Sequence, residues 1–104
     1  FKSEGNSLPT PSLIISQVCK FYSVDENVLR GTLKNKGVAE ARQMAMYLIR
    51  KLTNLSLPDI GKEFAKDHST VLYAIRKVEV ALKNGDKTIQ DNIQTITANI
   101  NACL

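Results

Sequence analysis

Hydrophobic residues recur at helical spacing along most of this chain, and no segment shows the two-residue alternation of a strand. The clearest segment runs from Val38 to Leu52, where apolar side chains follow i, i+3, i+4, i+7, i+8 and i+11. They are Ala41, Met44, Ala45, Leu48, Ile49 and Leu52. A stripe of this width predicts an amphipathic helix that forms the centre of the core.

A second regular stripe lies near the end of the sequence, after Asn84 and Gly85, a pair typical of a helix C-cap. Isoleucine repeats there at i, i+4, i+7 and i+11, as Ile89, Ile93, Ile96 and Ile100. This repeat predicts an amphipathic helix over about 86–102. Its polar face carries Asn, Gln and Thr, so the stripe packs either on the domain or on a partner protein.

Capping residues and prolines predict three further helices, with Asp25 and Ser56 as two of the N-caps. These helices extend over about 11–22, 25–29 and 56–64. A loop with glycine at both ends, GTLKNKG, occupies 31–37. We interpret residues 1–10 as a linker or terminal edge and 11–104 as one all-α domain.

The segment KDHSTVLYAIRKVE, residues 66–79, separates into two faces when it is wound as a helix. One face is an apolar stripe of Val71, Ile75, Val78 and, just beyond, Leu82. The opposite face gathers hydroxyls and cations: Ser69, Thr70, Tyr73, Arg76 and Lys77. With the short helix before it, this segment forms a predicted helix-turn-helix whose second helix runs from about His68 to Lys83.

Charge is concentrated in the middle of the chain. The formal net charge of the 104 residues is +4, and residues 30–77 hold ten basic against four acidic side chains. A basic centre fits a polyanion partner, although a merely soluble basic face fits equally well. No apolar run approaches a membrane span, and we interpret Cys19 and Cys103 as free thiols of a cytoplasmic protein.

The run Asp67-His68-Ser69-Thr70 admits three interpretations. Its residue types suggest hydrolase chemistry, but catalytic triads normally bring together separate segments, so we do not expect an enzyme. Asp67 is a natural N-cap for the following helix. The same helix end, placed in a major groove, would let the exposed side chains meet base edges. Spacing typical of metal ligands or phosphate-binding loops is absent from the sequence.

Two stretches carry a pattern more specific than that of a generic helix-turn-helix. They are ARQMAMYLIRKLTNLSLPDIG at 41–61 and KDHSTVLYAIRKVE at 66–79. Together they resemble the C-terminal DNA-binding domain of DnaA, the bacterial replication initiator, over about 12–84. The resemblance implies a helical bundle related to the Trp-repressor fold that binds double-stranded DnaA boxes at the replication origin. It further implies a nucleoid location and a monomeric isolated domain, without a cofactor. In that family, ATP is bound by an AAA+ module ahead of this domain.

The resemblance also implies roles for individual side chains. Residues expected to read bases are Pro58, near a thymine methyl, and Asp67, His68, Ser69 and Thr70 in the major groove. Residues expected at phosphates or the minor groove are Lys34, Lys36, Arg42, Gln43, Arg50, Lys66, Tyr73, Arg76 and Lys77. Among these, Lys34 occupies about the place of the family's minor-groove arginine.

The chain departs from the family pattern at three places. The 31–37 loop holds lysine but no arginine, and lysine matches a narrow, electronegative minor groove less well. The turn before Asp67 has Ala65-Lys66 where the family commonly has glycine-arginine, often with one residue more. Ser69 replaces a usual threonine. We therefore expect the 68–83 helix to supply more of the specificity than usual.

Two other functions fit parts of the sequence. A transposase-like or repressor-like helix-turn-helix would read an unrelated DNA site. A helical interaction domain would instead bind a partner protein through the isoleucine stripe of 86–102.

Overall fold

The computed structural model describes residues 8–33 and 35–104, and these ranges form helices without any strand, which confirms the all-α prediction. Lys34 and the first seven residues, including most of the predicted linker, lie outside the described residues. The helices are α1 (Pro11–Tyr22), α2 (Glu26–Leu29), α3 (Lys36–Leu52), α4 (Leu57–Phe64), α5 (His68–Lys83) and α6 (Lys87–Ala102).

Each of these helices begins after a side chain that accepts a backbone N–H from the first turn, which satisfies a donor that has no partner within the helix. The capping residues are Thr10, Asp25, Asn35, Ser56, Asp67 and Asp86. The Asn35 cap corrects one predicted boundary. Its Oδ1 accepts the Val38 N–H at 2.9 Å, so α3 begins at Lys36 rather than at Val38, and the preceding loop is shorter than predicted.

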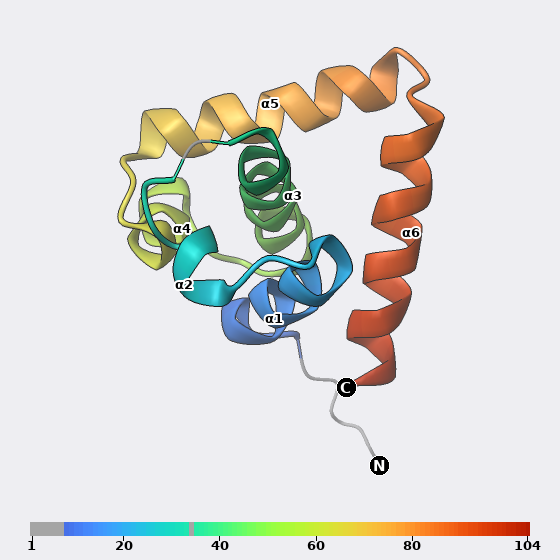
Figure 1. Cartoon of the computed structure of the whole chain (residues 1–104), viewed down its shortest axis with the longest axis horizontal. Coiled ribbons are helices and arrows are strands. Elements are labelled where there is room, and N and C mark those ends of the chain that lie inside the picture. The colour runs from blue at the N-terminus through green and yellow to red at the C-terminus, as the bar shows by residue number, and fades with distance from the viewer. Residues whose placement is uncertain (1–7, 34) are drawn as a thin grey trace.

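The core is built around α3, which is surrounded on several sides in Figure 1 by α1, α5 and α6. The predicted stripe is buried, with Leu52 only partly so. Burial extends beyond the stripe, because Met46 and Tyr47 are also enclosed. Neighbours on opposite sides of α3 therefore cover more of its circumference than the periodicity alone predicts.

The turn between α4 and α5 requires a close approach of two backbone segments. Ala65 adopts a left-handed conformation with φ of +54°, and the Lys66 N–H donates to the Gly61 carbonyl at 2.9 Å. A Cβ atom at Gly61 would lie well inside contact distance of the Lys66 carbonyl oxygen. Glycine at this position lets the short turn fold back onto α4 and sets the direction in which α5 leaves it.

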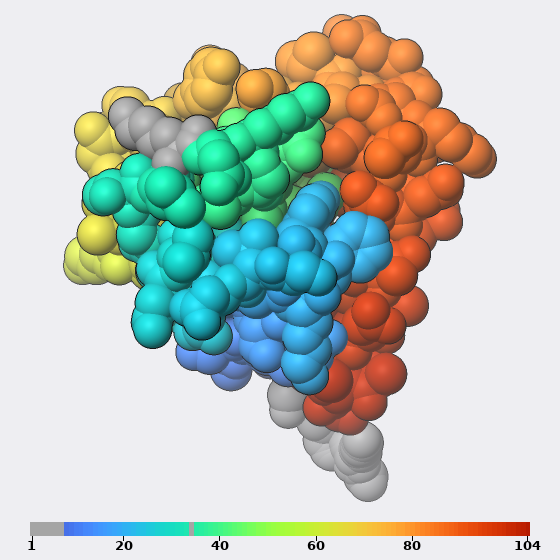
Figure 2. Space-filling view, in the orientation of Figure 1, coloured from blue at the N-terminus to red at the C-terminus, as the bar shows by residue number. Residues whose placement is uncertain are grey.

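The isoleucine stripe of α6 packs on the domain, one of the two alternatives that its sequence allowed. Ile96 and Ile100 are fully buried, and Ile89 and Ile93 are partly buried against the core. Figure 2 shows α6 as a continuous column of atoms along one side of the molecule, in contact with α1. Within the described residues, none of the helices combines the length and the apolar character needed to cross a bilayer.

Candidate nucleic-acid interface

The first turn of α5 is an exposed polar helix end that gathers four of the predicted site residues, Asp67 to Thr70. The Asp67 Oδ1 accepts the Thr70 N–H at 2.9 Å, which confirms that Asp67 caps the helix. Hydrogen bonds from Thr70, the backbone N–H first among them, lower the pKa of Asp67. His68, Ser69 and Thr70 are all exposed, so their side chains are available to a ligand placed against this helix end.

Further along α5, the two predicted faces are present. Val71, Ile75 and Val78 are buried, whereas Tyr73 is 64% exposed. Arg76 and Lys77 are also exposed. Helix α5 therefore presents hydroxyls at its start and an aromatic ring and cations along its length, while its apolar face holds it against α3 and α4.

A hollow of about 340 Å³ lies where α3, the turn before α5 and the start of the 31–35 loop meet. It brings together five of the predicted residues. They are Arg42, Gln43, Lys66, Thr70 and Tyr73. Thr32, which sequence analysis did not single out, lies on the loop side of the same hollow. The interface thus continues from the start of α5 onto the loop and α3.

A second hollow, of about 480 Å³, extends the same side of the molecule toward α6. Lys36, Gln43 and Lys77 all line it, so the first turn of α3 and the outer side of α5 contribute cations to one depression. Gln43 lines both hollows and connects them. Glu40 and Asp86 also line the second hollow, which disfavours an anion deep within it.

Arg42, which the resemblance assigns to phosphates or the minor groove, is buried, with only 8% of the residue exposed. Its Nε donates to the Leu29 carbonyl at 2.7 Å, and its Nη2 donates to the Val28 carbonyl at 3.2 Å. Burial lowers the pKa of its guanidinium. Its contacts make Arg42 a tie between α3 and the end of α2, and its contact with DNA stays a prediction.

Two other predicted residues, Pro58 and Arg50, lie apart from this centre. Pro58 is exposed in the first turn of α4. Arg50 is exposed near the end of α3, roughly 21 Å along the helix axis from Lys36 at 1.5 Å per residue. It donates to the Leu55 carbonyl at 3.0 Å and lines neither of the two hollows. The predicted role of Lys34 concerns a residue outside the described ranges.

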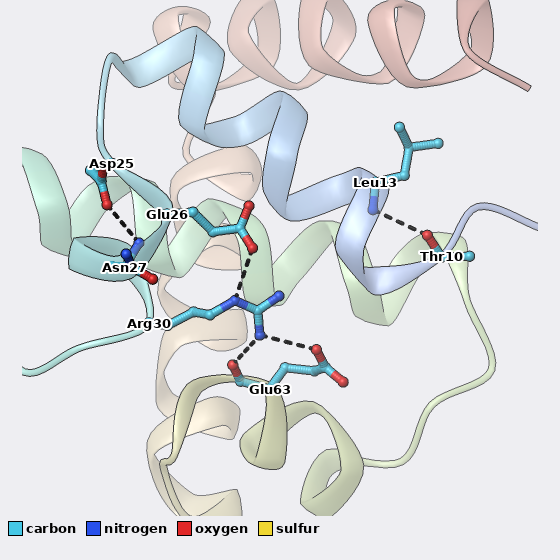
Figure 3. Close-up of polar contacts among 7 residues, drawn as sticks. All are labelled: Thr10, Leu13, Asp25, Glu26, Asn27, Arg30 and Glu63. Atoms are coloured by element: carbon cyan, nitrogen blue, oxygen red, sulfur yellow. Dashed lines mark hydrogen bonds and ion pairs between the residues drawn. The ribbon is translucent and has the colours of Figure 1, made fainter.

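Sequence analysis missed Arg30, which joins α2 to α4 (Figure 3). The four-residue spacing from Glu26 to Arg30 is a local signal for an ion pair. The contact to Glu63, however, spans 33 positions and leaves no local pattern.

A short capped helix, a three-residue turn and a second helix with an exposed polar face define a helix-turn-helix domain within an all-helical bundle. The family described as "Bacterial dnaA protein helix-turn-helix" matches residues 11–78. The chain belongs to this family.

Similar curated proteins include two named "Chromosomal replication initiator protein DnaA". The one from Corynebacterium aurimucosum is 45% identical over 92 residues, which are 88% of this chain and 17% of that protein. The one from Cutibacterium acnes is 42% identical over 99 residues, 93% of this chain and 20% of that protein. This chain therefore spans about a fifth of the length of such relatives.

A solved structure described as "Crystal structure of DNA replication initiation factor" has a similar fold. Its TM-score is 0.73 at 34% sequence identity, and the match covers 86% of this chain and 29% of that chain.

Proposed function

We propose that this chain is the DNA-binding module of a bacterial replication initiator and that it binds double-stranded DnaA boxes at the replication origin. Membership of the DnaA helix-turn-helix family and the names of the similar proteins support this proposal. The observation that carries it is the first turn of α5. There, four consecutive polar side chains, Asp67 to Thr70, are exposed at a helix end whose backbone is already capped.

In this proposal the first turn of α5 enters the major groove. The Asp67 carboxylate is ionised at neutral pH, and an ionised carboxylate only accepts hydrogen bonds. It therefore selects a base amino group, such as that of cytosine, and is repelled by a base acceptor. The hydroxyls of Ser69 and Thr70 bond either kind of edge, and the Thr70 methyl packs against a thymine methyl.

The rest of the interface supplies orientation rather than sequence reading. Tyr73, Arg76 and Lys77 project from α5 beside the major-groove end, and Gln43 and Lys36 extend this surface across α3. Cations in these positions neutralise phosphates and release counterions, which makes affinity depend on salt. Glu40 and Asp86 line the same hollow as Lys36 and Lys77 and disfavour a phosphate deep within it.

A binding selection on random duplexes tests this proposal against a transposase-like or repressor-like alternative. The proposal predicts that one short asymmetric sequence, the DnaA box, is enriched. Enrichment of an unrelated or palindromic site would overturn it. The alternative of partner binding through the isoleucine stripe receives less support, because that stripe is covered by the domain's own helices.

A further inference from the structure

Arg30, at the end of α2, makes an ion pair with its own helix and another with α4. Its Nε lies 3.2 Å from the Glu26 Oε2. Its Nη1 donates to the Glu63 carbonyl at 2.7 Å and lies 3.2 Å from the Glu63 Oε1. Figure 3 shows the guanidinium extended between the two glutamates, which come from separate helices. The Arg30 side chain thus joins α2 to the last turn of α4, which is the first helix of the helix-turn-helix.

The acceptor on α4 explains why this contact is strong. The carbonyl of Glu63 is among the last four of its helix, which have no N–H partner within the helix. A charged donor satisfies it with a hydrogen bond stronger than one between neutral groups. The Arg30 side chain is 28% exposed, so this bond is partly shielded from water.

The backbone on either side of Arg30 is held by two further cations. Arg42 donates to the carbonyls of Val28 and Leu29, and the Lys66 Nζ donates to the Gly31 carbonyl at 3.4 Å. Lys66 belongs to the turn that leads into α5. The backbone of residues 28–31, where the loop begins, is therefore attached to α3, to α4 and to the turn before α5.

Charge around Arg30 argues against direct DNA contact. Two carboxylates, Glu26 and Glu63, lie against its single guanidinium, so the cluster is net negative and attracts a phosphate poorly. Arg30 directly precedes the 31–35 loop, in which lysine is the only cationic residue type. The guanidinium of Arg30, however, directs its donors toward α2 and α4. Its effect on DNA must pass through the position of the loop and the turn.

We propose that Arg30 is a positioning residue for DNA recognition, which holds residues 31–33 beside the first turn of α5 so that both meet DNA as one rigid unit. The hollow that Thr32 shares with Lys66 and Thr70 shows how near these parts lie. This inference rests on the proposed DNA-box function and adds a residue to it that contacts no base or phosphate.

The test compares Arg30→Gln with Lys20→Gln, which removes the same charge from an exposed position on α1. Affinity for a DnaA box and for a scrambled duplex is titrated at two salt concentrations, and folding is checked by urea unfolding. Arg30→Gln should lower affinity for the box about five- to tenfold and change affinity for the scrambled duplex less than about twofold. Its salt slope should equal that of Lys20→Gln.

Two results would overturn the inference. Equal losses on both duplexes with a shallower salt slope than Lys20→Gln would make Arg30 a phosphate contact. Unchanged affinity for both duplexes would leave it a stability residue only. If the unsubstituted chain fails to prefer the box, the proposed function itself fails, which is a distinct outcome.

Glu63→Gln provides a second variant, which retains the Arg30 residue and the backbone carbonyl of position 63 but removes the carboxylate that pairs with Arg30. Removing one negative charge near DNA should raise affinity for the scrambled duplex. The inference predicts that the ratio of box affinity to scrambled affinity nevertheless falls, because the ion pair that orients Arg30 is lost. An equal rise on both duplexes would mean that the cluster acts through charge alone, and would contradict the positioning role.

Discussion

Replacing Gly61 by alanine separates two physical effects of opposite sign. Gly61 lies inside α4, where helix propensity alone predicts that alanine stabilises the fold by about 0.5–1 kcal/mol. The structure predicts the reverse, because the added methyl would overlap the Lys66 carbonyl oxygen, which belongs to backbone. A backbone segment cannot rotate away as a flexible side chain does.

The magnitude follows from what must move. Overpacking at a tight site costs about 1–3 kcal/mol. Displacing the turn also loses the hydrogen bond from the Lys66 N–H to the Gly61 carbonyl, worth about 1 kcal/mol. The sum, offset by the propensity gain, leaves a destabilisation of about 1–3.5 kcal/mol. A domain of this size has a total stability of roughly 5–15 kcal/mol, so the variant should still fold.

Urea unfolding measures this change, and Gly37→Ala is the matched control. Gly37 also lies in a helix, but among the residues that the structure describes a methyl there would meet nothing nearer than the Asn35 Oδ1 at 3.7 Å. The control should be neutral or slightly stabilised, whereas Gly61→Ala should unfold at lower urea and lose affinity for the box. Equal stabilisation of both variants would refute the role assigned to the turn.

Four further predictions concern single residues. Ala65→Gly should raise the free energy of unfolding by about 0.5–1 kcal/mol in a urea titration, because Ala65 has φ of +54°, and unchanged stability would contradict this. Thr70→Ala should cost about 1–3 kcal/mol of binding to the box in a duplex titration and little on scrambled DNA, while equal losses would exclude base reading. Lys77→Ala should weaken binding to all duplexes and reduce the slope of log affinity against log salt by about 1, and an unchanged slope would remove its phosphate role. Because the folded pKa of Asp67 lies below its ordinary 3.8, its charge stabilises the fold above that pH and loses this effect as pH falls through the folded value. The stability difference between the unsubstituted chain and Asp67→Asn, which keeps a capping side chain, should therefore shrink at acid pH; a constant difference would show that the charge is not involved.

Local signals in the sequence predicted most of the helices. The stripe at 38–52 and the isoleucine repeat both describe faces that the structure buries, since each repeat records contact with a core on one side. The start of α3 was predicted two residues late. Asparagine is an effective N-cap, but Gly37 directly inside the helix made this stretch look like loop.

The residues of the candidate site also fall into two groups, those that a local pattern predicts and those that depend on contacts distant in sequence. The capping of α5 by Asp67 and the polar run that follows it are both local features of the sequence, so the exposed polar start of α5 was predicted well. The burial of Arg42 depends on carbonyls at the end of α2, 13 and 14 positions away, and no periodicity encodes that contact. Arg30 was missed for the same reason, because its partner on α4 becomes a neighbour only when the chain folds.

We propose above all that the exposed first turn of α5 makes this domain bind one specific DNA sequence. Titration of the chain against a DnaA box and a scrambled duplex, each at two salt concentrations, tests it most directly. We expect the box to be bound more tightly than the scrambled duplex, on the order of a thousandfold, and both affinities to fall as salt rises while the preference persists. Equal affinity for the two duplexes at both salt concentrations would contradict it.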